Sequence, residues 1–229
     1  MKNRFEHENA CRRVAARFPS RFLYQYIIRK LQTDPAYPAV YEEVCASSAP
    51  LLDVGCGLGL LGFYLRERGF ENPIVGLDRD LRKVRAAQRV ASEYQEVDLR
   101  AQDLRGTLTE FSGNVAILDV LHYLSSDDQQ DLLSRVAGRI APGAALLVRD
   151  CPRDAGLRYA GTYLAEKFAQ LVAWNIDVPL HFPSRETILQ NFSPNEFGRD
   201  VKPLWGGTPF NNHFFTFRRH SCATAATPE

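Results

Sequence analysis

The residues with the clearest chemical potential lie in the segment DVGCGLG at positions 53–59, where a carboxylate precedes three glycines at alternate positions. Glycines at this spacing let the chain turn sharply and let its backbone approach a ligand closely. About 20 residues later, Asp78 ends the apolar run VGLD. A carboxylate at the end of a second strand can accept hydrogen bonds from both hydroxyls of a ribose. Together these features predict a ligand that contains a nucleoside.

Two kinds of nucleoside ligand fit this spacing. Gly57, Gly59 and Gly62 also satisfy the pattern G-x-G-x-x-G, which is typical of NAD-binding proteins. A diphosphate, however, is held by backbone N–H groups and the positive end of a helix, and Asp53 would place a carboxylate beside it. S-adenosylmethionine has no phosphate and carries a positive amino group and a positive sulfonium. The sequence therefore favours S-adenosylmethionine, with a nicotinamide-dependent oxidoreductase as the alternative.

An alternation of apolar runs and helical stretches must position these groups. Strands are predicted at residues 51–54, 73–77, 96–101, 115–118 and 144–148, and helices at 57–67, 81–92 and 126–140. A capping box, SDDQ at 126–129, opens the last of these helices. Strands separated by single helices pair in parallel through right-handed crossovers. The pattern predicts a Rossmann-like, doubly wound α/β sheet with the ligand outside the carboxyl ends of its strands.

Further elements are predicted on both sides of this region. Four apolar residues recur at four-residue intervals and should share one helix face: Val14, Phe18, Phe22 and Tyr26. Pro19 and Ser20 should nevertheless interrupt this helix, and Ser20 should cap the next one. The remaining predicted elements are helices at 34–45, 159–174 and 184–192 and strands at 201–205 and 213–218. The last two strands should form an antiparallel hairpin, which brings the sheet to seven strands.

A single domain is expected, because 229 residues with 45% hydrophobic content suffice for one core. We expect N-terminal helices at 1–48 as part of that domain and the α/β region at 49–220. A helical lid insertion at about 151–195 should cover the ligand face, and residues 221–229 should form a flexible tail.

Charge and composition exclude several classes of protein. The 28 basic and 27 acidic residues give a net charge of +1, which argues against a protein that wraps nucleic acid. No run approaches the ~20 apolar residues of a membrane span, and the start MKNRFEHENACRR lacks a signal core, so a cytoplasmic location is expected. The five cysteines are far apart without a CxxC pair, and they are interpreted as free thiols, with no disulfide framework or metal site.

Five segments resemble motifs of the class I S-adenosylmethionine-dependent methyltransferases. LLDVGCGLG resembles the first motif of this family, and VGLD the second. AQDL at 101–104 resembles the segment after the third strand, NVAILDVLHYL the fourth motif, and IAPGAALLVRD the turn and fifth strand. The resemblance spans about residues 51–150 in register. It implies a methyltransferase that uses S-adenosylmethionine and releases S-adenosylhomocysteine.

The resemblance also implies a set of cofactor-binding residues. Those carried over are Asp53, Gly55, Gly57, Asp78, Asp103 and Asp119, with Arg79 and Leu104 as neighbours. In the family, the acidic side chain at the position of Asp103 meets the adenine amino group, and the next backbone N–H meets the ring. One departure is Leu60 after Gly59, where many members carry Thr or Ser; it removes one hydroxyl contact.

The methyl acceptor should lie just beyond the fourth strand, at DVLHY in positions 119–123. Methyl transfer is a direct displacement, so the protein mainly aligns the acceptor and excludes water, and a base is needed only where the acceptor proton is not lost readily. His122 is a candidate base unless it only hydrogen-bonds backbone, Tyr123 a candidate contact, and His181 an alternative base. Because the segment is not Asn-Pro-Pro-Tyr, which holds planar nitrogens, we expect O- or C-methylation of a small aromatic or apolar acceptor.

The segments YIIRKLQTDPAY at 26–37 and PLWGGTPFNNHFFTFRR at 203–219 resemble methyltransferases encoded with bacterial aryl polyene or polyketide-type pigment pathways. This resemblance implies an acceptor that could be tethered to an acidic acyl carrier protein. Residues 1–30 hold eight basic and two acidic residues, and Arg12, Arg13 and Arg17 are the predicted contacts. A non-catalytic cofactor-binding module and an RNA methyltransferase stay open as alternatives.

Overall fold

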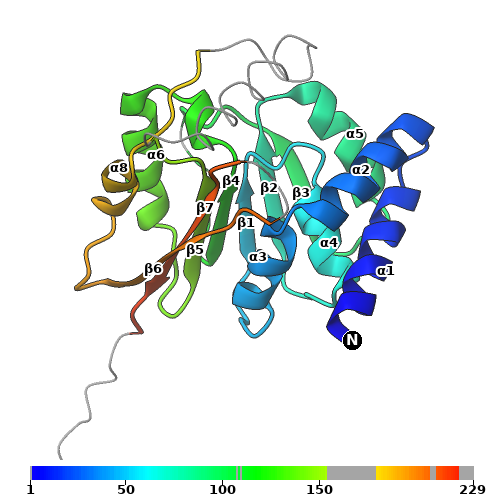
Figure 1. Ribbon diagram of the computed structural model, residues 1–229, viewed down its shortest axis with the longest axis horizontal. Helices are drawn as coiled ribbons and strands as arrows, with labels where there is room; N and C mark the ends of the chain where they lie inside the picture. The colour runs from blue at the N-terminus through cyan, green and yellow to red at the C-terminus, as the bar shows by residue number, and fades with distance from the viewer. Residues whose placement is uncertain (1, 107, 109, 154–178, 207–209, 222–229) are drawn as a thin grey trace, which may run out of the picture.

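A mixed β-sheet forms the centre of the computed structural model, which describes residues 2–106, 108, 110–153, 179–206 and 210–221. In this part of the chain the sheet has seven strands in the order β3-β2-β1-β4-β5-β7-β6 (Figure 1). They are β1 (Leu51–Val54), β2 (Ile74–Asp78), β3 (Val97–Ala101), β4 (Asn114–Leu118), β5 (Ala145–Asp150), β6 (Phe197–Pro203) and β7 (His213–Arg219). The first five pair in parallel, and β7 is antiparallel to both β5 and β6. The predicted fold class is confirmed.

The strand order places a crevice at the carboxyl ends of β1 and β4. Strand β1 pairs in parallel with β2 on one side and with β4 on the other. The chain runs from β1 outward to β2 and β3, and then returns to β4 and β5 on the opposite side. The loops that follow β1 and β4 therefore diverge, which is where open α/β sheets bind ligands.

Helices cover both faces of the sheet (Figure 1). One face carries α1 (Lys2–Ala16), α2 (Arg21–Thr33), α3 (Ala36–Val44), α4 (Leu60–Glu67) and α5 (Leu81–Ala91), and the other carries α6 (Ser126–Ala137) and the short α8 (Arg185–Leu189). Successive residues of β5 enter different cores: Leu147 packs with the first set, Leu146 and Val148 with the second. Burial on both faces explains why these strands are almost wholly apolar.

The N-terminal helices confirm the predicted break but not the shared helix face. Ser20 caps α2 by accepting a hydrogen bond from the backbone N–H of Leu23 at 3.4 Å. Val14 and Phe18 are buried in the core with α4, whereas Phe22, beyond the break, is 68% exposed. The change of direction at 17–20 resets the helical phase, so the four-residue spacing does not carry across it.

Several predicted boundaries differ from the structure, and three of the differences have a clear local basis. The capping residue of α6 is Ser125, whose hydroxyl accepts from the N–H of Asp128 at 3.2 Å, so the cap lies one residue before the predicted box. The helix capped by Ser184 ends at Leu189 instead of residue 192. Strand β6 begins at Phe197, because backbone pairing with β7 extends through polar residues that face outward.

Several expectations lie outside the described residues. These are the helix at 159–174, with most of the insertion at 151–195, and nearly all of the tail from residue 222. No helix within the described ranges is long and apolar enough to cross a lipid bilayer.

Candidate functional site

A large cavity of about 630 Å³ lies at the carboxyl ends of β1, β2 and β4. Every predicted cofactor residue lines it: Asp53, Gly55, Gly57, Asp78, Arg79, Asp103, Leu104 and Asp119. Tyr123 lines the same cavity, and helix α2 adds Phe22, Tyr26 and Lys30. The structure thus gathers residues from distant segments of the chain around one space. Their roles toward a ligand stay predictions.

The glycines of the loop after β1 have separate reasons to be glycine. Gly55 and Gly57 have φ of +82° and +55°, in the left-handed region that side chains rarely adopt. A Cβ on Gly55 would lie 2.2 Å from Cγ2 of Val120, so the loop after β4 packs directly on it. A Cβ on Gly57 would meet nothing closer than Oδ2 of Asp78 at 4.0 Å. Gly55 therefore allows close packing, and Gly57 leaves open space beside the acid.

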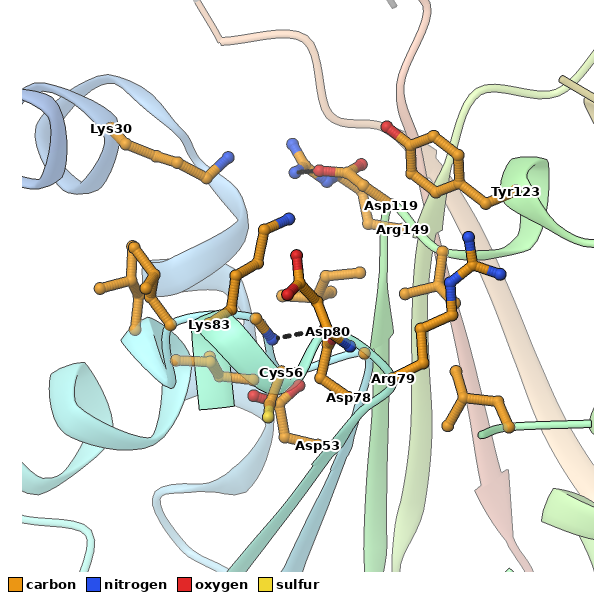
Figure 2. Close-up of a pocket in the computed structure, with 18 of the residues that line it drawn as sticks. Lys30, Asp53, Cys56, Asp78, Arg79, Asp80, Lys83, Asp119, Tyr123 and Arg149 are labelled. Carbon is orange, nitrogen blue, oxygen red and sulfur yellow. Dashed lines mark hydrogen bonds and ion pairs between the residues drawn. The ribbon is translucent and has the colours of Figure 1, made fainter. Parts of the chain in front are cut away.

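Two carboxylates lie together beneath this loop (Figure 2). Asp78 accepts hydrogen bonds from the backbone N–H of Gly57 at 2.8 Å and of Asp80 at 2.7 Å, which fix its orientation. Asp53 is buried, and burial, followed by the nearby Asp78 carboxylate, raises the pKa of Asp53 from its ordinary value to about 7. Such a pair attracts a positive group and repels a diphosphate. The N–H of Gly57, which a diphosphate would need, already donates to Asp78.

The opposite wall after β3 holds Asp103 and Leu104. Asp103 forms an ion pair of 2.5 Å with Arg105, and this side-chain hydrogen bond is the main cause that lowers the pKa of Asp103 to about 2. Leu104 is buried. Arg79 lies on this side of the cavity and away from Lys30 (Figure 2). This wall therefore offers an ionised acceptor, an apolar side chain and a planar cation.

A cluster of four charged residues closes the other end of the cavity. Arg149, at the end of β5, donates two hydrogen bonds to Asp34 at 2.9 and 3.1 Å and forms an ion pair with Asp119. Lys30 donates to Asp34 at 3.1 Å. Asp119 has a φ of +58°, a strained backbone for a residue other than glycine. We refer to Lys30, Asp34, Asp119 and Arg149 as the charge cluster.

A second cavity of about 190 Å³ lies on the far side of the charge cluster. Lys30, Asp119 and Arg149 line both cavities, so the two cavities meet at these residues. The second cavity is lined further by Pro35, His122, Cys151, Leu204, Phe210 and Asn212. It is small, partly aromatic and polar where it meets the large cavity.

His122 lines this second cavity and is held by an acid. Its Nδ1 lies 2.8 Å from Oδ1 of Asp150, and its ring stacks on Phe182 at a centroid distance of 5.2 Å. Asp150 is fully buried and also accepts from the backbone N–H groups of Leu121 and Cys151, at 3.0 and 2.8 Å. An acid fixed in this way orients the histidine ring and stabilises its protonated form.

The structure does not bring His181 to either cavity. Its side chain is exposed, and its backbone N–H donates to the carbonyl of His122 at 2.8 Å. His181 therefore shapes the loop around His122 through its main chain. Of the apolar residues next to His181 in the segment LHFP, Phe182 and Pro183 are buried.

Sequence reasoning missed Lys30, Asp34 and the orienting role of Asp150. Asp34 and Arg149 are 115 positions apart, and Asp34 looks in the sequence like an ordinary acid before proline. Two of the predicted carrier contacts also have intramolecular partners: Arg13 forms an ion pair with Glu67, and Arg17 with Glu93. No local pattern could have shown these contacts, because each joins distant parts of the chain.

Among the described residues, no group of three or more His, Cys, Asp or Glu side chains could hold a metal ion. Cys11, Cys45, Cys56 and Cys151 are free thiols.

Comparison with known proteins adds a family match. A family model described as "Methyltransferase domain" matches residues 51–143, which run from β1 to the turn before β5. The chain is 25% identical over 135 residues to N-demethylindolmycin N-methyltransferase of Streptomyces griseus, covering 54% of this chain and 56% of that protein. It is 25% identical over 114 residues to carboxy-S-adenosyl-L-methionine synthase of Shewanella halifaxensis, covering 48% and 47%. The chain spans about half the length of these curated relatives.

Solved structures share the fold over nearly the whole chain. The magnesium protoporphyrin IX methyltransferase of Synechocystis, with bound SAH, superposes with a TM-score of 0.64 over 92% of this chain and 93% of that one. The two sequences are 20% identical, so this likeness concerns the fold.

Proposed function

We propose that the chain is a class I S-adenosylmethionine-dependent methyltransferase that methylates a small organic acceptor, which the match of residues 51–143 to a methyltransferase family model and the strand order support. The observation that carries the proposal is the pair of carboxylates, Asp53 and Asp78, beneath the glycine loop. A positive amino group and sulfonium are attracted there, whereas the two phosphates of NAD would be repelled. The printed names of both curated relatives also refer to methylation or to S-adenosylmethionine.

The walls of the large cavity suggest how the cofactor is held. Asp78 suits the ribose hydroxyls because backbone N–H groups already orient its carboxylate. Asp103 and Leu104 suit the adenine, one as an acceptor for its amino group and the other as an apolar surface, with Arg79 beside them. Gly55 and Gly57 provide the close approach. Asp53 and Asp119 are left to meet the positive groups of the methionine portion.

The second cavity is the proposed acceptor site. S-adenosylmethionine supplies the methyl group, which leaves the sulfonium sulfur for an oxygen or carbon of the acceptor. His122 is placed to accept the acceptor's proton at Nε2, because Nδ1 faces Asp150 at 2.8 Å. Asp150 then stabilises the positive ring. Tyr123 lines the cofactor cavity beside His122, with ring centroids 4.2 Å apart, and is a candidate acceptor contact.

The size and lining of the second cavity favour a single aromatic ring with a polar substituent. A volume of about 190 Å³ leaves no room for a large fused ring system. Phe210 and Leu204 supply apolar contact, and Asn212 and the charge cluster supply hydrogen bonds. We therefore propose O- or C-methylation of a hydroxylated aryl group, with His122 as the base. The exposed side chain of His181 has no role in this proposal.

A labelled methyl group tests this function. The protein is incubated with S-adenosylmethionine labelled in its methyl group and a panel of substituted phenols, and products are analysed by mass spectrometry. We expect label in a single-ring product and about 10²–10⁴-fold slower turnover after His122→Ala, with less loss for the exposed control His181→Ala. Consumption of the cofactor without a labelled acceptor would contradict methyl transfer.

We also propose that the acceptor arrives on an acidic acyl carrier protein. Because Arg13 and Arg17 are engaged with Glu67 and Glu93, the docking face is better placed on α2, beside the cavity. This helix carries basic and no acidic residues, with Phe22 exposed at its start. An acidic acyl carrier protein should bind the variants Arg21→Gln and Arg29→Gln more weakly than the wild type, and equal affinity would refute this docking face.

We also propose a cytoplasmic, reducing location for the protein, which the free thiols support.

A further inference from the structure

We propose that Lys30 recognises the carboxylate of the cofactor's amino-acid portion, at the boundary between the two cavities. This inference rests on the proposed function. The adenosine end of S-adenosylmethionine has several predicted partners, and its positive groups have Asp53 and Asp119. Its carboxylate has none among the residues that the sequence identified. A carboxylate removed from water needs a cation or several hydrogen-bond donors.

Among the described residues, four cationic side chains line the large cavity: Lys30, Arg79, Lys83 and Arg149. Two of them are attached next to the predicted ribose-binding residue: Arg79 follows Asp78 directly in the chain, and Lys83 lies in the first turn of α5, which starts at Leu81. In Figure 2 the Arg79 guanidinium lies beneath Tyr123, away from Lys30, whereas Lys83 extends toward the space between Lys30 and Arg149. Lys83 is therefore the rival that the experiment must separate from Lys30.

Arg149 is the weaker of the two remaining candidates. Its guanidinium is almost fully buried, donates two hydrogen bonds to Asp34 and forms an ion pair with Asp119. Two carboxylates thus neutralise its single charge. Its Nε has no hydrogen-bond partner among the described residues, but a third carboxylate on this buried group would add a negative charge that no further cation balances.

Lys30 keeps capacity for a new ligand. An ammonium group has three N–H donors, and Asp34 accepts one of them at 3.1 Å. The Lys30 side chain is one-third exposed (33%) and reaches from α2 toward the space above Asp119 (Figure 2). Burial tends to lower the pKa of Lys30, but Tyr37 and then Asp34 outweigh it and raise this pKa, so the group stays charged.

The position of Asp119 strengthens the assignment. The amino group and carboxylate of the cofactor are attached to one carbon atom, so the residues that bind them must be neighbours. Lys30 and Asp119 both belong to the charge cluster and both line the large cavity. The strained backbone of Asp119, with a φ of +58°, holds its carboxylate at this place. The pair offers an anion for the amino group of the cofactor and a cation for its carboxylate.

Two ligands that differ in the amino-acid portion can distinguish recognition of the carboxylate by Lys30 from a purely structural role of this residue. S-adenosylhomocysteine contains the amino-acid portion, and 5′-methylthioadenosine has the same nucleoside and sulfur without it. Calorimetric titration of Lys30→Met should show binding of S-adenosylhomocysteine weakened about 10–100-fold, with affinity for 5′-methylthioadenosine unchanged within about twofold. Lys83→Met, a lysine of the same cavity, is the matched control and should not discriminate between the two ligands.

Lys30→Arg keeps the charge and should retain most of the affinity for S-adenosylhomocysteine, which guards against loss through misfolding of the Met variant. An equal loss for both ligands in Lys30→Met, or no loss for either, would overturn the assignment. If the wild-type protein bound neither ligand, the proposed function itself would fail, and that result differs from both of the others.

Discussion

The two ends of the cavity treat buried acids in opposite ways. Under the glycine loop, Asp53 and Asp78 lie together, and Asp78 is held by backbone N–H groups. In the charge cluster, Asp34 and Asp119 are held by Arg149 and Lys30. The first pair keeps a surplus of negative potential, whereas the second is neutral overall. A positive group of a ligand therefore finds an attractive field at the loop, whereas the charge cluster can meet a positive and a negative group together.

The largest expected loss of stability comes from a substitution in the charge cluster. Arg149→Met would leave two carboxylates buried without their main cation, which costs ~3–5 kcal/mol of unfolding free energy. Urea unfolding measures it. Arg79→Met, in the same cavity but less buried, should cost under ~1 kcal/mol. Similar losses for the two variants would remove the contrast between the cluster and the rest of the cavity.

The next largest effect is expected at Asp53 under the glycine loop, where a substitution should increase the free energy of unfolding. Because Asp53 titrates near pH 7 in the folded protein and near 3.8 when unfolded, the unfolded state loses its proton first as pH rises. The contribution of Asp53 to stability therefore falls between about pH 4 and 7, and Asp53→Asn should be more stable than wild type at pH 8 by ~4 kcal/mol. Thermal unfolding at pH 5 and 8 measures the change.

The same residue should show the reverse trend in binding. A positive ligand favours the ionised form of Asp53, so affinity for S-adenosylmethionine should rise from pH 6 to 8 in the wild type. It should rise much less in Asp53→Asn. A variant that is both less stable and equally dependent on pH would contradict the reading of this acid as a ligand-binding group.

Two glycines sharpen the description of the loop end. Gly55→Ala meets Val120 at 2.2 Å, so it should lower stability by ~1–3 kcal/mol in addition to backbone strain. Gly57→Ala has open space and should cost only the strain of its positive φ, ~1–2 kcal/mol, but its methyl group would enter the cavity. Unfolding and calorimetry on both variants should show a mainly structural loss at Gly55 and a mainly binding loss at Gly57.

The smallest effect is expected at the exposed ion pair on the adenine wall. Arg105 lowers the pKa of Asp103 to about 2, so any stabilisation is present above about pH 4 and disappears as pH falls toward 2. Solvent screens this pair, and Asp103→Asn should change the unfolding free energy by less than ~1 kcal/mol. A larger change in chemical denaturation would show that exposure does not separate this acid from the buried ones.

The sequence predicts the loop end far better than the charge cluster. Residues 53–59 and Asp78 lie in a repeating alternation of strand and helix, so periodicity and glycine spacing place them at one edge of the sheet. The doubly wound sheet and its hairpin follow from the same regularities. Lys30 lies in α2 and Asp34 directly after it, and a side-chain hydrogen bond joins Asp34 to Arg149. No local pattern encodes a contact across 115 positions.

The acceptor side shows the same limit. The end of the fourth strand predicts His122 as a site residue, but its partner Asp150 becomes visible only when β4 and β5 are side by side. The apolar neighbours of His181 favour it as an alternative base, yet Phe182 and Pro183 are buried whereas the His181 side chain is exposed. Burial of one residue in a loop does not determine burial of the next.

Selection of an adenosyl amino acid over a dinucleotide by the acids of the glycine loop can be measured by competitive calorimetric titration with S-adenosylhomocysteine and NADH. We expect saturable heat with S-adenosylhomocysteine, none with NADH, and about 10–100-fold weaker binding of S-adenosylhomocysteine after Asp78→Ala. Saturable binding of NADH with no response to S-adenosylhomocysteine would contradict this selection.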